Sequence, residues 1–283
     1  MTKIVRRALG AGRWFPGDER QLSSMVGKCV ESAEVEDMEG RIAGAIAPHA
    51  GYVYSGPVAG YTFRAIRDNA EKAGKPDVVV ILGLSHRGGF GGTALMDGEA
   101  ISTPMGEVKL DNEAAEALVS TGRSVEMNYA PHGGEHSAEN QVPFVQYALP
   151  DTPVVIGLMG DHTPETVSDM VSGLSGLGEK RNVLVVASSD MLHDPDYEKV
   201  TNTDRRTLEK LAAMDAKGIR ADWNYSEQIL CGVAPVLTAM EYAAAEGCRE
   251  GKVLYYRNSG DDFPESRGSW VVGYGAVVFS GKS

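Results

Sequence analysis

Four short, unbroken apolar runs rich in Val, Ile and Ala give the chain its clearest pattern. They are Arg41–Ala47, Asp77–Leu84, Thr152–Met159 and Asn182–Ser188. An apolar run of this length without polar alternation is typical of a strand that is buried on both faces, as in a parallel or mixed sheet. We therefore predict that these four segments form the centre of one sheet.

Segments with helical periodicity lie between and after these runs. They are Asp18–Ser32, Gly56–Asn69, Asn112–Ser120, Ser137–Ala148, Pro164–Leu177, Thr203–Met214 and Gly232–Ala245. Asp18 and Ser137 are the expected N-caps of their helices, since short polar side chains accept from the free N–H groups of a first turn. The alternation of strands and helices predicts an α/β protein, with helices on both faces of a mixed, largely parallel sheet.

The remaining pattern adds shorter strands but no second domain. Lys252–Arg257 and Ser269–Phe279 are predicted to close the sheet, and Thr93–Met96, Ala100–Ser102 and Glu107–Leu110 are predicted to form short strands around a turn. We find no repeat, low-complexity segment or linker, and so we interpret residues 1–283 as a single domain.

The amino-acid composition limits which binding partners and which cellular compartment we expect. The 27 Lys and Arg against 39 Asp and Glu give a net charge of −12, which argues against nucleic acid and against anionic membranes. There is no apolar run of about 18 residues and no apolar signal segment at the start, so we expect a cytoplasmic protein. Its three cysteines include no CxxC pair, so no disulfide framework is expected. Nothing in the sequence specifies an oligomeric state.

Histidine and aspartate gather where the buried runs end. The first run is followed by Pro48-His49, the second by Ser85-His86, and the fourth by a segment that contains Asp190 and His193. In open α/β sheets, ligands bind outside the carboxyl ends of the strands. These side chains therefore predict one polar pocket at that edge, and histidine makes a metal site the leading interpretation.

Each of these residues also has a plainer interpretation. His49 could equally cap a tight loop, and the glycines after His86 could cradle a phosphate, although no G-x-G-x-x-G motif is present. Cys231 precedes an apolar helix, where the helix dipole would favour its thiolate as a ligand or nucleophile, but a free cysteine often only packs. Cys29 and Cys248 are expected to pack.

A second polar cluster occupies residues 131–140. With Ser137 as a helix cap, His136 and Glu139 would lie close together near the helix start; a solvated loop is the competing interpretation for His132 and, less so, for His136. His162 is expected to lie at the surface or to cap a helix.

Five of these segments together resemble the Memo family. They are Ala47–Gly56 (APHAGYVYSG), Ile81–His86 (ILGLSH), Glu135–Phe144 (EHSAENQVPF), Ser188–His193 (SSDMLH) and Ile229–Pro235 (ILCGVAP). Arg13–Pro16 and the final Tyr274-Gly275-Ala276 strand fit as well, so the likeness extends from about Gly10 to Phe279 in the same order.

The resemblance implies the fold of the class III extradiol ring-cleaving dioxygenases and a metal held by His49, His86 and Cys231. It also implies three further residues around the same pocket: His136, Asp190 and His193. The dioxygenases hold Fe(II) with two histidines and a carboxylate, whereas Cys231 replaces the carboxylate here. Fe(II) is therefore the first expectation, with copper or zinc as alternatives because sulfur is a softer ligand.

Three classes of function remain open at this point. The first is a redox enzyme that uses Fe(II) or copper, with His193 as an acid–base residue beside the metal. The second is a zinc hydrolase with His193 or Glu139 as base, or a metal-free variant in which Cys231 attacks and Asp190 orients His193. The third is a binding protein whose pocket holds a small molecule or a peptide without turnover. Trp14, Tyr52 and Tyr54 are expected near the pocket mouth.

Overall fold

The four central apolar runs form adjacent, parallel strands in the computed structural model, which describes residues 4–281. The strands are β2 (Arg41–Ala47), β9 (Val183–Ser188), β3 (Val78–Leu84) and β8 (Val154–Met159), in that spatial order. Every residue in them except Arg41 is buried. Because the four run the same way, their carboxyl ends meet at one edge of the sheet.

Antiparallel pairing extends the sheet on both sides of this centre. On one side β12 (Val271–Gly281) pairs with β2, and both β10 (His193–Asp194) and β11 (Gly251–Asn258) pair with β12. On the other side β4 (Thr93–Leu95) pairs with β8, and β7 (Val125–Met127) runs parallel to β4. A separate small sheet contains β1 (Val5–Arg7), β5 (Ala100–Thr103) and β6 (Gly106–Lys109). The prediction of a mixed sheet is confirmed.

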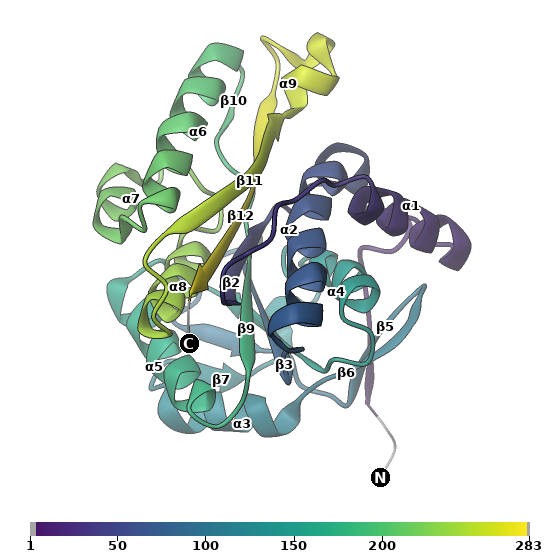
Figure 1. Ribbon diagram of the computed structural model, residues 1–283, viewed down its shortest axis with the longest axis vertical. Coiled ribbons are helices and arrows are strands. Elements are labelled where there is room, and N and C mark those ends of the chain that lie inside the picture. Colours follow the sequence, from purple (N-terminus) through teal and green to yellow (C-terminus); the bar gives the residue numbers. More distant parts are fainter. Residues whose placement is uncertain (1–3, 282–283) are drawn as a thin grey trace.

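Helices cover both faces of the sheet (Figure 1). Val80 and Leu82 of β3 belong to one core with α3 (Asn112–Thr121), α5 (Pro164–Gly178) and α8 (Val233–Ala245). The alternate residues Val79 and Ile81 belong to a second core with α1 (Glu19–Glu31), α2 (Tyr52–Ala73) and α4 (Val142–Ala148). Successive strand residues point to opposite faces, so unbroken apolar runs are what this two-sided burial requires.

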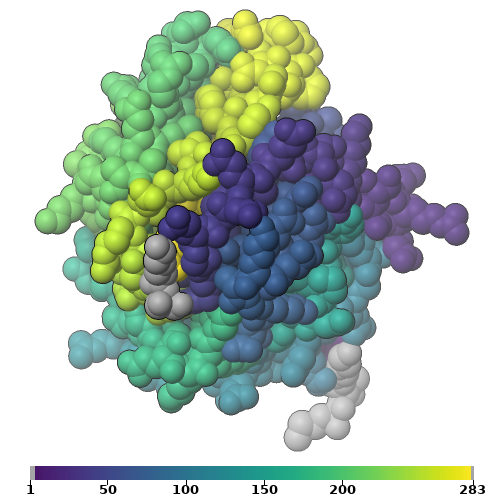
Figure 2. All heavy atoms as spheres, in the orientation of Figure 1, coloured from purple at the N-terminus to yellow at the C-terminus, as the bar shows by residue number. Residues whose placement is uncertain are grey.

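Helices also pack on both sides of the C-terminal strands. Besides α8, the last third of the chain contains α6 (Tyr197–Ala212), α7 (Ala216–Asp222) and α9 (Ser259–Asp262). Strand β11 contacts both α6 and α2, and Figure 2 shows the yellow C-terminal segment between the green segment and the purple and blue ones. Among the described residues, no helix has both the length and the apolar character needed to cross a membrane.

Two helix starts were predicted from their capping residues, and the structure confirms one of the two. Asp18 caps α1 by accepting from the N–H of Gln21, as predicted. The prediction that Ser137 caps the fourth helix is wrong, because its hydroxyl instead donates to the carbonyl of Leu84. A 3-10 turn over Glu139–Gln141 follows, and α4 begins only at Val142.

The close packing of α8 on the sheet gives a test of the fold. A Cβ at Gly44 of β2 would lie 2.7 Å from the carbonyl oxygen of Ala239 in α8. We expect Gly44→Ala to lower the free energy of unfolding by about 1–3 kcal/mol in denaturant titration, because backbone cannot move aside cheaply. Gly176→Ala is the matched control, since a Cβ there meets no atom within 4 Å. Equal stability of the two variants would contradict this packing.

Candidate metal centre

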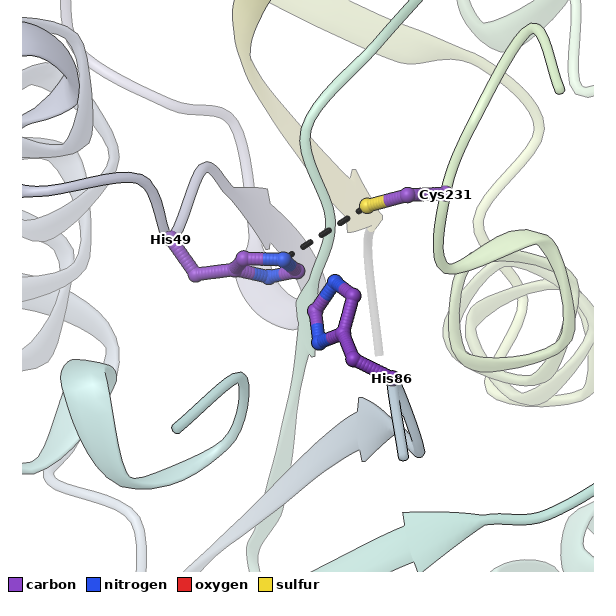
Figure 3. Close-up of side chains that lie close together, drawn as sticks. All are labelled: His49, His86 and Cys231. Carbon is purple, nitrogen blue, oxygen red and sulfur yellow. Dashed lines mark hydrogen bonds between the residues drawn. The ribbon is translucent and has the colours of Figure 1, made fainter. Parts of the chain in front are cut away.

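Three side chains from distant parts of the chain converge at the carboxyl edge of the sheet. His49 follows β2, His86 follows β3, and Cys231 lies just before α8. Their donor atoms all lie within 4.8 Å of one another, and the Nε2 of His49 is 3.5 Å from the Sγ of Cys231. Figure 3 shows the two imidazoles and the thiol pointing toward one common point. The structure thus brings together the three residues that the sequence analysis proposed as ligands.

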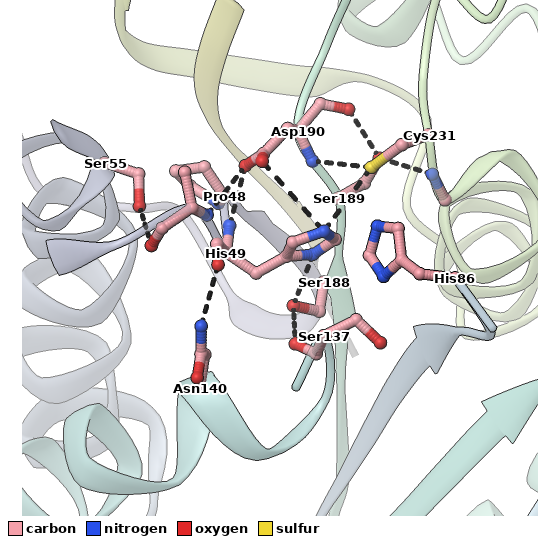
Figure 4. A network of polar contacts seen from close by, with 12 residues as sticks. Pro48, His49, Ser55, His86, Ser137, Asn140, Ser188, Ser189, Asp190 and Cys231 are labelled. Carbon is pink, nitrogen blue, oxygen red and sulfur yellow. Dashed lines mark hydrogen bonds and ion pairs between the residues drawn. The ribbon is translucent and has the colours of Figure 1, made fainter. Parts of the chain in front are cut away.

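The ring of His49 has its proton position fixed by its neighbours. Its Nδ1 lies 3.1 Å from the hydroxyl of Ser188 (Figure 4). That hydroxyl donates its one hydrogen to the carbonyl of Ser137, at 2.5 Å, and accepts from the amide of Gln141, at 2.7 Å. The bond to His49 therefore needs a proton on Nδ1. Burial lowers the pKa of His49, so the ring is neutral and its Nε2 lone pair faces Cys231.

Glu135 fixes the ring of His86 in the same way. Its carboxylate accepts from the backbone N–H of His86 (2.6 Å), from His86 Nδ1 (2.9 Å), and from the backbone N–H groups of His136 (2.8 Å) and Ser137 (2.9 Å). Burial alone would raise the pKa of Glu135, but the bonds from His86 and Ser137 hold it well below its usual range. An ionised carboxylate only accepts, so His86 carries its proton on Nδ1 and leaves Nε2 free.

The same carboxylate lies in a second group of metal-binding residue types, together with His86 and His136. Its Oε1 already accepts three N–H groups and its Oε2 accepts a fourth. A metal there would have to displace bonds that hold the backbone. Glu135 is therefore better suited to orienting the metal ligand His86 through a hydrogen bond than to binding a metal itself.

Cys231 is a buried thiol in the absence of metal. Burial and the nearby charge of Asp190 raise its pKa well above the usual range, so the thiolate that the helix position predicted is not favoured by the protein alone. Its Sγ accepts from the backbone N–H of Asp190, at 3.2 Å, and lies 3.6 Å from the hydroxyl of Ser189. These polar neighbours suit a sulfur that becomes negatively charged when it binds a metal.

Asp190 joins the two loops that carry His49 and Cys231. Its carboxylate accepts from the backbone N–H groups of His49 (2.7 Å) and Ala50 (3.2 Å), and its carbonyl accepts from the N–H of Cys231 (3.1 Å). Its Oδ2 also lies 4.0 Å from His49 Nε2. The structure thus places Asp190 at the site, with its carboxylate engaged in holding the backbone.

His193 and His136 have different neighbours in the structure. His193 opens β10, and its Nε2 is buried without a hydrogen-bond partner among the described residues. Burial lowers the pKa of His193, which keeps the ring neutral at pH 7. His136 is stacked between Trp14 (centroids 3.8 Å apart) and His86 (4.9 Å), and burial lowers its pKa to about 4.

The aromatic residues expected at the pocket mouth take three different places. Trp14 lies at the site through its stacking on His136. Tyr52 is instead buried in the core, where its hydroxyl donates to the carbonyl of Asn140, so the expectation for it is wrong. Tyr54 is exposed and packs edge-on against Phe263, with centroids 4.9 Å apart.

The residues that hold the two imidazoles through hydrogen bonds were not predicted from the sequence. Glu135, Ser188 and Gln141 all lie in the motifs that carried the resemblance, but the expected pairing was His136 with Glu139. The Glu139 carboxylate instead accepts from the N–H of Gly10, and burial raises its pKa to about 7. Glu139 therefore anchors the N-terminal loop.

Comparison with known proteins agrees with this picture. The family model described as "Memo-like protein" matches residues 6–278. The MEMO1 family protein MK0963 of Methanopyrus kandleri is 33% identical over 95% of this chain and 96% of its own length. A MEMO1 family protein of Nitrosopumilus maritimus is 30% identical over 98% of this chain and all of its own.

A solved structure shows the same fold at low identity. The crystal structure of the uncharacterized protein JW3007 from Escherichia coli K12 matches with a TM-score of 0.53 and 14% identity, covering 77% of this chain and 92% of that one. At this identity the likeness concerns the fold alone.

The hydrogen bonds behind the imidazoles predict a fixed tautomer for each ring. In metal-free protein near pH 7.5, we expect ¹⁵N NMR to show His49 and His86 protonated on Nδ1. Glu135→Gln should release His86 into a mixture of tautomers, because an amide cannot accept on both of its ends. Glu139→Gln is the control, since Glu139 is equally buried but bonds Gly10. A proton on Nε2 of His86 in the unmodified protein would contradict the assignment.

Proposed function

This chain belongs to the Memo family, and on that premise we propose that it is a metal-dependent redox protein whose metal is held by His49, His86 and Cys231. The observation that carries the proposal is the convergence of three donor atoms within 4.8 Å, two of them imidazole nitrogens that carry lone pairs. Fe(II) is the metal we expect first. Copper or zinc also suits a set that includes sulfur.

The residues fit a metal for three reasons that do not depend on resemblance. Each imidazole has its Nδ1 already engaged, by Ser188 in His49 and by Glu135 in His86, which leaves Nε2 as the nitrogen available to a metal. The thiol has polar neighbours around its sulfur. Three protein ligands also leave coordination positions open, which distinguishes a reactive site from a closed structural one. Iron or copper held here would supply one-electron chemistry and a place for a small molecule to bind.

The protein's own groups divide the remaining tasks. Asp190 keeps the loops of His49 and Cys231 together through its hydrogen bonds to both. His193 is neutral, buried and unpartnered at Nε2, so it is the group we assign to accept or donate a proton at a bound ligand. Trp14 and His136 form a stacked wall against His86, which helps to keep its ring in place.

Metal analysis separates this proposal from its alternatives. In protein purified without oxygen and without chelator, we expect iron, or failing that copper, near one equivalent per chain by elemental analysis. Zinc as the only metal would support the hydrolase interpretation, in which the same three ligands hold a water nucleophile. Protein that neither retains nor takes up any of these metals would contradict the proposal and support a ligand-binding role without catalysis.

Single substitutions assign the ligands. We expect His49→Ala, His86→Ala and Cys231→Ala each to reduce bound metal at least tenfold, because each removes one of three bonds to the metal. His193→Ala should retain about one equivalent. Cys29→Ala is the matched control for Cys231, since Cys29 is a free cysteine in α1, on the opposite face of the sheet from α8. Loss of metal from the His193 variant would make His193 a ligand and overturn the assignment.

A further inference from the structure

A buried carboxyl group on α6 contacts the segment that carries Asp190 and His193. Asp204 is inaccessible to water, and both of its carboxylate oxygens are engaged. Its Oδ1 accepts from the backbone N–H of Leu192, at 3.1 Å, and its Oδ2 accepts from the hydroxyl of Tyr256 on β11, at 2.8 Å. Since Leu192 lies between Asp190 and His193 in the chain, Asp204 joins α6 to this segment of the candidate centre.

The backbone of residues 189–192 is held by hydrogen bonds to four separate acceptors. In chain order, its N–H groups donate to the carbonyl of Ala47 (3.0 Å), the Sγ of Cys231 (3.2 Å), the carbonyl of Gly273 (2.8 Å) and the carboxylate of Asp204 (3.1 Å). Of these acceptors, only Asp204 belongs to a helix. Through Asp204, the packing of α6 thus fixes the last backbone group of this run.

The surroundings of Asp204 hold its carboxyl group in one place. Burial raises the pKa of Asp204 to about 7, although the hydrogen bonds from Tyr256 and Leu192 oppose the rise, and no charged side chain contributes to the shift. Burying such a group costs free energy that an apolar side chain would not cost. A Cβ at Gly273 of β12 would overlap Oδ2 of Asp204, so the carboxyl group packs directly on the strand backbone. Leu192 therefore has a rigidly placed acceptor, and Oδ1 can accept whether or not Oδ2 carries a proton.

The bond to Leu192 matters at the centre because Asp190 is two residues away. The N–H of Asp190 donates to the sulfur of Cys231, at 3.2 Å, and its carbonyl accepts from the N–H of Cys231, at 3.1 Å. An N–H group held against sulfur favours the thiolate that a metal binds. Without its acceptor, the buried N–H of Leu192 would be unpaired, which is costly, and the segment would shift to find another partner. Asp190 would then no longer hold its N–H against the sulfur.

We propose that Asp204 is a positioning residue of the metal centre, which holds Leu192 so that the N–H of Asp190 stays against the sulfur of Cys231. Its hydrogen bonds go to Leu192 and Tyr256, so it acts on the centre through the backbone of residues 190–192. The inference rests on the proposed function, because only a bound metal turns the placement of the sulfur into a change of affinity. The hydrogen bond itself can be measured in metal-free protein.

The test compares two substitutions of Asp204 in full-length protein, with Co(II) alone as the metal probe. Asp204→Ala removes the acceptor, whereas Asp204→Asn keeps Oδ1 as an acceptor and can donate from its amide to the Tyr256 oxygen. We expect the Ala variant to bind Co(II) about tenfold more weakly, with a weaker thiolate-to-cobalt charge-transfer absorption, and the Asn variant to stay within about twofold of the unmodified protein. In metal-free protein, NMR should show hydrogen exchange of the Leu192 amide about tenfold faster in the Ala variant alone.

Thr207→Ala is the matched control. Thr207 is buried on the same helix, but its hydroxyl donates to the carbonyl of Thr203 within α6, so this variant should leave the cobalt spectrum and the Leu192 exchange unchanged. Where Asp204→Ala does not fold, Asp204→Leu, which fills the space with apolar groups and cannot accept, gives the same readouts.

The outcomes separate this inference from the proposed function. A folded variant without the acceptor that keeps the unmodified Co(II) affinity and spectrum, or unchanged exchange at Leu192, would overturn the positioning role of Asp204. An Asn variant as weak as the Ala variant would overturn it too. Unmodified protein that binds no Co(II), while exchange at Leu192 still depends on the acceptor, would refute the proposed function and keep the hydrogen bond.

Discussion

The ionised carboxylate of Glu135 is the constraint on which the candidate centre depends most. It accepts four N–H groups, two from His86 and two from the backbone that follows it, and is nearly inaccessible to water. A buried carboxylate is stable only when such bonds replace its hydration. The hydrogen bonds that satisfy this carboxylate fix the loop after β3 and the start of the 135–141 segment. They also fix the proton of His86 on Nδ1. The Ser188 hydroxyl likewise fixes the proton of His49 on Nδ1, through hydrogen bonds between uncharged groups. The protein thus orients both imidazoles without the help of a metal.

The position of this centre follows from the order of the strands. Because β2, β9 and β3 are neighbours in the sheet, the segments after them reach the same edge although they are far apart in sequence. The final ligand comes from the loop before α8, and α8 packs across these strands on one face. The N-terminal loop reaches the same edge from the other side, where Trp14 stacks on His136. Helix packing on both faces therefore holds a site to which every element contributes only one or two side chains.

The sequence predicted most of the fold because burial on two faces leaves a simple signature. In the run Asp77–Leu84, no residue after Asp77 is polar, and β3 spans Val78–Leu84 with every residue buried. The strand ends also predicted which histidines would gather. The partners of those histidines could not be predicted in this way, since Glu135 and Ser188 act through loop geometry that has no period. Ser137 shows the limit most clearly: its type and position are those of a helix cap, but a carbonyl at the end of β3 takes its hydroxyl hydrogen.

We propose that two imidazoles and one thiolate of this chain bind the same metal ion. X-ray absorption spectroscopy of the protein loaded with one equivalent of iron, under exclusion of oxygen, measures this most directly. We expect scattering from one sulfur and from imidazole nitrogens around the metal, with the sulfur contribution abolished in Cys231→Ala. A first coordination shell of oxygen and nitrogen alone in the unmodified protein would contradict it.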